Sequence, residues 1–142
     1  MTRRAAVVVC AALLVAACAT NGRGTPATGP GGGPVEVRPS VEPAPGATLT
    51  LSLSDDDAEV GSACTTLDEW VDGTWRARWF WVQPSPSPVA IPDGDERTCP
   101  AIGIPLPAEQ TVALPDDLLS GTWRLAYVAG EDDIGAYVFE VS

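Results

Sequence analysis

Hydrophobic and polar positions alternate with a period of two in several short runs from Thr48 onwards, and no run repeats at helical spacing. Leu49, Leu51 and Leu53 alternate with threonine and serine, which predicts a strand with one buried face. Similar runs follow at 63–82, 110–115, 122–129 and 136–141. About seven short strands without an amphipathic helix predict an all-β sandwich over residues 47–142.

The strongest local signal is a hairpin around Asp72-Gly73, because this pair favours a type I′ turn between two strands. Counting outward from the turn pairs Trp70 with Trp75 and Cys64 with Trp81. One face of the hairpin then carries Cys64, Trp70, Trp75, Trp79 and Trp81. The other face carries Leu67, Glu69, Arg76, Arg78 and Phe80, with Glu69 and Arg76 placed to form an ion pair.

The tryptophans of this hairpin have two possible roles. They fill the core if Cys64, on their face of the hairpin, forms a buried disulfide beside them. If they are exposed, their indole rings would stack on sugar rings, and neighbouring arginines would form hydrogen bonds to the sugar hydroxyl groups. The candidate ligand contacts are therefore Trp70, Trp75, Trp79, Trp81, Arg76 and Arg78.

Residues 1–17 have the composition of a cleaved signal peptide, with two arginines before an apolar run of thirteen residues. As a helix this run is about 20 Å long, too short to span a hydrocarbon core of roughly 30 Å. The stretch "VAAC" resembles the lipobox of bacterial lipoproteins, which implies a lipid on Cys18 and the loss of Cys10 with the signal peptide. The alternative is an ordinary secretory signal with a chance cysteine. The resemblance predicts a lipid-anchored protein on the extracytoplasmic face of the bacterial membrane.

Residues 18–46 are mostly Gly, Pro, Ala, Thr and Ser, which predicts a disordered tether between the lipidated Cys18 and the domain. Once the signal peptide is removed and Cys18 is lipidated, Cys64 and Cys99 are the two thiols that remain. Because an exported domain is in an oxidising compartment, they are expected to form a disulfide.

The charge and composition exclude several function classes. The formal net charge is −11, and loss of Arg3 and Arg4 leaves six arginines against nineteen acids, or −13, which disfavours nucleic acid and anionic lipid. The absence of histidine removes the usual base of a serine or cysteine nucleophile and the commonest zinc or copper ligand. Pro92–Glu96 could form half of a calcium loop, but it lacks the ligand spacing of an EF-hand. We therefore expect a protein without enzymatic activity, cofactor or metal.

Two segments, "LDEWVDGTWR" and "CPAIGIPLPAEQTVALPDDLLSGTWRLAYV", carry a resemblance to a known family. They resemble the central hairpin and the closing half of the immunoglobulin-like domains in bacterial surface lipoproteins. The similarity covers about Thr48 to Ser142. The chain departs from antibody-type domains because its cysteine spacing is too short for the inter-sheet bridge and no tyrosine lies two residues before Cys99. The resemblance implies a sandwich on a lipid tether and no particular activity.

The expected function is therefore that of a non-catalytic, membrane-anchored surface lipoprotein. Its immunoglobulin-like domain would bind an unknown protein or cell-wall partner through loops such as Gln83–Cys99. One alternative is a glycan- or cell-wall-binding module that uses exposed tryptophans. Another is an exported inhibitor of a hydrolase that presents the proline-stiffened segment Pro84–Pro92, because a rigid loop loses little entropy on docking.

Overall fold

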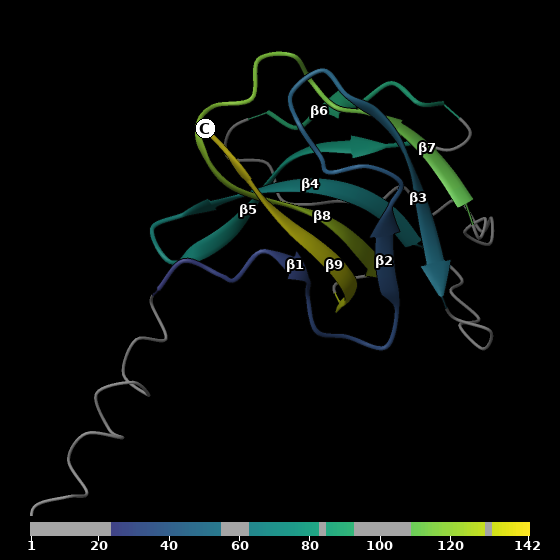
Figure 1. The fold of residues 1–142 in the computed structure, drawn as a ribbon, viewed down its shortest axis with the longest axis horizontal. Helices are drawn as coiled ribbons and strands as arrows, with labels where there is room; N and C mark the ends of the chain where they lie inside the picture. The colour runs from purple at the N-terminus through teal and green to yellow at the C-terminus, as the bar shows by residue number, and fades with distance from the viewer. Residues whose placement is uncertain (1–23, 55–62, 83–84, 93–108, 130–131) are drawn as a thin grey trace, which may run out of the picture.

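Two antiparallel sheets make up the part of the chain that the computed structural model describes, which is residues 24–54, 63–82, 85–92, 109–129 and 132–142. The strands are β1 (Gly29–Pro30), β2 (Glu36–Pro39), β3 (Thr48–Ser54), β4 (Ala63–Val71), β5 (Thr74–Trp81), β6 (Val89–Ala90), β7 (Glu109–Ala113), β8 (Gly121–Ala129) and β9 (Asp132–Val141). The larger sheet has the order β1-β9-β8-β4-β5-β6, and the smaller one has the order β2-β3-β7 (Figure 1). The prediction of an all-β sandwich is confirmed at this level.

Two long hairpins, β4–β5 and β8–β9, form the middle of the larger sheet. The alternation seen in the sequence sets their faces, because successive side chains of a strand point to opposite sides. Trp123, Leu125 and Tyr127 of β8 point toward the smaller sheet, and each is at most 1% exposed.

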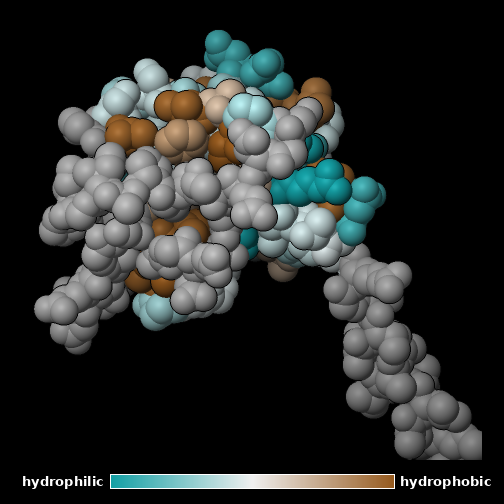
Figure 2. Space-filling view, turned by 180° about the vertical axis from the view of Figure 1, so that it is seen from behind, coloured by the Kyte–Doolittle hydropathy of each residue, from teal (hydrophilic) through white to brown (hydrophobic). Residues whose placement is uncertain are grey.

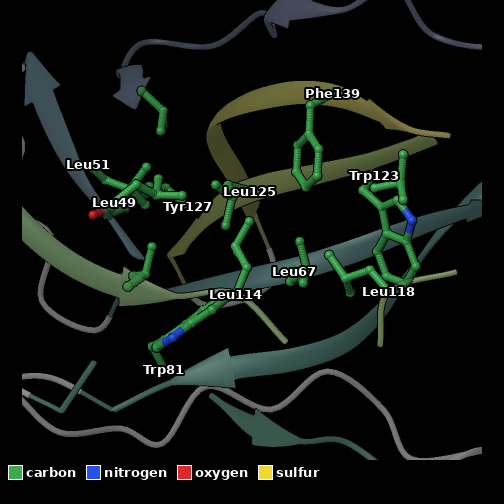
Figure 3. Close-up of a cluster of buried hydrophobic side chains, with 13 residues drawn as sticks. Leu49, Leu51, Leu67, Trp81, Leu114, Leu118, Trp123, Leu125, Tyr127 and Phe139 are labelled. Carbon is green, nitrogen blue, oxygen red and sulfur yellow. The ribbon is translucent and has the colours of Figure 1, made fainter. Parts of the chain in front are cut away.

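The core lies between the two sheets. Leu49, Leu51 and Val112 of the smaller sheet pack against buried residues of the larger sheet, which include Leu67, Trp81, Trp123, Leu125, Tyr127, Phe139 and Val141. Figure 3 shows Leu114 beside Trp81 and Leu118 beside Trp123. Both leucines belong to the segment that leads from β7 to β8, so this connection also covers the core.

The first described residues, which the composition assigned to a disordered tether, are part of the sandwich. β1 pairs with β9, and β2 pairs with β3. Val35 and Val37 are 4% and 0% exposed. The folded part therefore begins before residue 47.

The glycines of this segment explain why its composition was misleading. Gly33 has a φ of 135°, and a Cβ atom there would lie 2.6 Å from the carbonyl oxygen of Ile134. This glycine is needed for close approach to β9 and not for chain flexibility.

The proline-rich segment 85–92 lies along the opposite side of the sandwich. Val89–Ala90 pairs with β5, and the backbone N–H of Ile91 donates to Arg78 O at 2.8 Å. The carbonyl of Pro86 accepts from the N–H of Ala113 in β7, also at 2.8 Å. This segment therefore connects the two sheets. Such a role suits an edge segment, since proline has no backbone N–H to donate to a neighbouring strand.

Cys64 of β4 is 6% exposed and disulfide-bonded. Its expected partner, Cys99, lies outside the described residues, so the pairing Cys64–Cys99 stays a prediction.

Across the described ranges, no helix has the length and apolar character needed to cross a membrane.

Candidate functional site

The β4–β5 hairpin is the candidate site, and its turn has the predicted geometry. Asp72 and Gly73 have φ values of 52° and 79°, the positive angles of a type I′ turn. The predicted register holds near the turn, where Trp70 lies opposite Trp75 and Asp68 lies opposite Ala77.

Beyond Asp68 the register shifts by one residue, and the predicted faces are wrong from that point. Leu67 lies opposite Trp79, and Thr65 lies opposite Trp81, because a bulge adds one residue to β5. A one-residue shift moves every following side chain to the other face of the sheet. Trp79 and Trp81 therefore share the face of Leu67, while Cys64, Trp70 and Trp75 lie on the opposite face, so the prediction that Cys64 lies beside Trp79 and Trp81 is wrong.

The two shifted tryptophans belong to the core. Trp81 is 1% exposed, and its indole N–H donates to the carbonyl of Pro86 at 3.0 Å. Trp79 is partly buried and packs against Trp123, with ring centroids 5.8 Å apart at an interplanar angle of 43°. These rings are not available as a flat surface for a ligand.

Trp70 and Trp75, both partly buried, lie on the outer face of the larger sheet near the turn. Their rings meet edge to face, with centroids 5.0 Å apart and an interplanar angle of 63°. The guanidinium of Arg124 lies 4.7 Å from the ring centroid of Trp75. One face of Trp75 is therefore already covered by a cation, which reduces the area available for stacking.

An ion pair holds Arg124 in this position. Its Nε donates to Oδ2 of Asp68 at 2.7 Å, and the side chains of Arg124 and Asp68 are 10% and 0% exposed. Removing either partner of such a buried pair strongly destabilises the fold, because the remaining charge stays in a region of low polarity. The pair joins the two central strands of the larger sheet and fixes the environment of Trp75.

The two candidate arginines of β5 differ in their surroundings. Arg78 donates from Nε to Oε2 of Glu69 at 2.9 Å. The predicted partner of Glu69 was Arg76, and this prediction is wrong because the bulge brings Arg78 to the carboxylate instead. Arg76 is exposed, opposite Glu69 in the register.

A polar link crosses the core between the two sheets. The Thr65 hydroxyl donates to Oε1 of Gln110 at 2.7 Å, and both residues are buried. Tyr127 lies opposite Thr65 in the register. Burial raises the pKa of the Tyr127 phenol well above its ordinary value, and the Thr65 hydroxyl lowers it by a smaller amount.

The structure also contains a hollow that the sequence did not reveal. It has a volume of about 360 Å³, and Pro30, Pro39, Val41 and Tyr137 are among its lining residues. The Tyr137 phenol donates to Oε2 of Glu42 at 3.0 Å, and partial burial together with this carboxylate raises its pKa. The alternation in "VEVRP" is the only sequence signal for the strand beside this hollow.

Several predicted sites lie outside the described residues. These are Cys18, Cys99 and the acidic part of the proposed calcium loop. Within the described ranges, no group of three His, Cys, Asp or Glu residues is placed to hold a metal ion. Comparison of the chain with protein-family models, curated proteins and solved structures found no match.

Proposed function

We propose that this chain is a membrane-anchored surface lipoprotein without enzymatic activity, whose immunoglobulin-like domain binds a protein or another component of the cell envelope. The lipid would be attached to Cys18 at the lipobox-like stretch Val15–Cys18, and residues 1–17 would be removed. A disulfide between Cys64 and Cys99 would fit such an oxidising location.

The strand order supports the immunoglobulin-like assignment. In variable-type domains one sheet runs G-F-C-C′-C″, and the other contains the neighbours A, B and E. The order β9-β8-β4-β5-β6 facing β2-β3-β7 follows the same scheme. The chain differs in its disulfide, because Cys64 lies on β4, which would be strand C, whereas the antibody bridge joins B and F. An experimental structure with a different strand order would contradict the assignment.

The observation that carries the functional proposal is the position of the tryptophans. Trp81 and Trp123 are each 1% exposed, and Trp79 packs against the core. The aromatic residues that suggested a ligand platform thus mainly stabilise the sandwich. A domain of this kind, joined to a lipid anchor, is suited to binding through its surface.

The anchor is tested by comparing wild type with Cys18→Ala in a bacterial host. The wild type should partition into the detergent phase and the membrane fraction, and Cys18→Ala should appear in the medium or periplasm. Cys10→Ala is the matched control and should behave as wild type, because Cys10 would leave with the signal peptide. Equal membrane partitioning of Cys18→Ala and wild type would contradict the proposal.

A glycan- or wall-binding module remains the second candidate, since Trp70 is partly exposed and Arg76 is exposed on the same hairpin. The cation over Trp75 counts against it. A change in tryptophan emission on titration with cell-wall polysaccharides, lost in Trp70→Ala, would favour this candidate. The inhibitor alternative has lost its main argument, because Pro86 and Ile91 are hydrogen-bonded to the sheets.

A further inference from the structure

One end of the sandwich collects segments that are far apart in the sequence. The turn between β4 and β5 lies there, and the pairing of Gly121 with Val141 places the start of β8 and the end of β9 at the same end. β1 runs antiparallel to β9, so the chain that precedes Gly29 comes from this end as well. Figure 1 shows the first coloured residues, the β4–β5 turn and the C-terminus on the same side of the molecule.

This proximal end, defined by the 71–74 turn, Leu119 and the pair Trp70–Trp75, exposes the Leu119 side chain and part of the two indole rings. Leu119 lies two residues before β8 and is 69% exposed, the largest value among the exposed large hydrophobic residues of the described ranges. Its carbonyl accepts from the indole N–H of Trp123 at 2.9 Å, which fixes the backbone while the side chain points outward.

The lipid anchor would lie close to the proximal end. Six residue steps separate Cys18 from Gly24, the first described residue. Whatever its conformation, a chain of this length spans at most about 22 Å. The opposite end of β4 is farther away, because the strand from Val71 to Thr65 adds about 20 Å.

We propose that the proximal end rests on the membrane surface, with Leu119, Trp70 and Trp75 in contact with the lipid interface. This proposal rests on the lipid anchor of the proposed function. Tryptophan suits such a contact because its ring is apolar and its N–H remains in the wet headgroup region. The short distance to the anchor keeps these side chains at a high effective concentration near the lipid, so a small contact area is sufficient.

The charges near the contact determine which lipid it prefers. Asp72, Asp116 and Asp117 are exposed on loops of the proximal end and outnumber the exposed Arg76 beside the turn. Carboxylates are repelled by anionic headgroups, so the contact should be closest on zwitterionic lipid. In the view from behind, hydrophilic and pale residues surround a few hydrophobic ones where the chain enters, which fits contact at the interface without deep insertion (Figure 2).

The orientation can be measured on the full lipidated protein in zwitterionic vesicles that contain a headgroup-labelled nitroxide lipid. A fluorophore is attached to Thr74→Cys at the proximal end or to Ser87→Cys in the proline-rich segment. Both positions are exposed. We expect about twofold or greater quenching at residue 74 relative to residue 87, because residue 74 would lie beside the labelled headgroups and residue 87 away from them.

Leu119→Ser tests whether the side chains of the proximal end contact the lipid. Val89→Ser is the matched control, because Val89 is an aliphatic residue in the edge strand β6 and is 44% exposed. Leu119→Ser should reduce quenching at residue 74 several-fold, and Val89→Ser should leave it unchanged. Equal quenching at the two labels in vesicle-bound protein, or no effect of Leu119→Ser, would overturn the contact. Wild-type protein that fails to float with the vesicles would overturn the anchor itself.

Discussion

Replacing Trp81 by phenylalanine tests the bulge that brings this side chain into the core. The change removes roughly 40 Å³ of side chain, which costs about 1 kcal/mol at the usual penalty for a cavity. It also removes the indole donor to Pro86 O, which contributes about 1 kcal/mol. The free energy of unfolding should therefore fall by about 2 kcal/mol.

Trp75→Phe is the matched control, since this residue lies on the same strand but on the outer face. Phenylalanine keeps a ring beneath Arg124 and weakens the cation–π contact by about 0.5 kcal/mol. Urea unfolding of the oxidised protein, followed by far-ultraviolet circular dichroism, measures both variants. With an m value of about 1–3 kcal/mol per M, the midpoint should fall by about 1 M for Trp81→Phe and about 0.3 M for Trp75→Phe. Similar losses for the two variants would contradict the bulge, because the unshifted register places Trp75 and Trp81 on the same face.

Two further predictions concern alkaline pH and the first described residues. Burial raises the pKa of the Tyr127 phenol, so this group ionises at lower pH in the unfolded chain than in the folded one. The free energy of unfolding should therefore keep its full value below about pH 10 and fall above it by up to about 1.4 kcal/mol per pH unit. Tyr127→Phe should reduce this slope in pH-dependent urea titrations, and the slope that remains is assigned to Tyr137, whose pKa is also raised. A fragment that begins at Ala47 should be about 3–6 kcal/mol less stable than one that begins at Gly24, because it lacks Val35 and Val37. Equal urea midpoints for the two fragments would contradict the pairing of β1 and β2.

The sequence predicted the hairpin well where the signal was local. Asp72-Gly73 determines the turn and the pairs next to it, because a type I′ turn fixes the register of the strands that leave it. The bulge beyond Asp68 could not be predicted, since it depends on the neighbouring strand. Leu67 and Asp68 also pair with Leu125 and Arg124 of β8, and this pairing selects the faces of Trp79 and Trp81.

Composition was a poor guide to the proline- and glycine-rich segments. Low apolar content predicted a tether, yet two valines suffice to fix residues 35–37 once β3 and β9 offer hydrogen-bond partners. Such partners come from distant parts of the chain, so no local pattern records them. The same holds for Pro86, whose carbonyl connects two segments that the sequence treats as separate.

Residues 29–39 and 85–92 cover the two lateral edges of the sandwich, which limits how a partner can bind. On one side, Gly31 and Val35 donate to β9 while β2 pairs with β3. On the other, Ile91 donates to β5 while Pro86 accepts from β7. Short edge strands that contain proline resist the addition of another strand, so binding by sheet extension is disfavoured. With its lateral edges covered and one end held toward the membrane by the proposed anchor, the domain would offer a partner its opposite end, about 20 Å farther from the lipid.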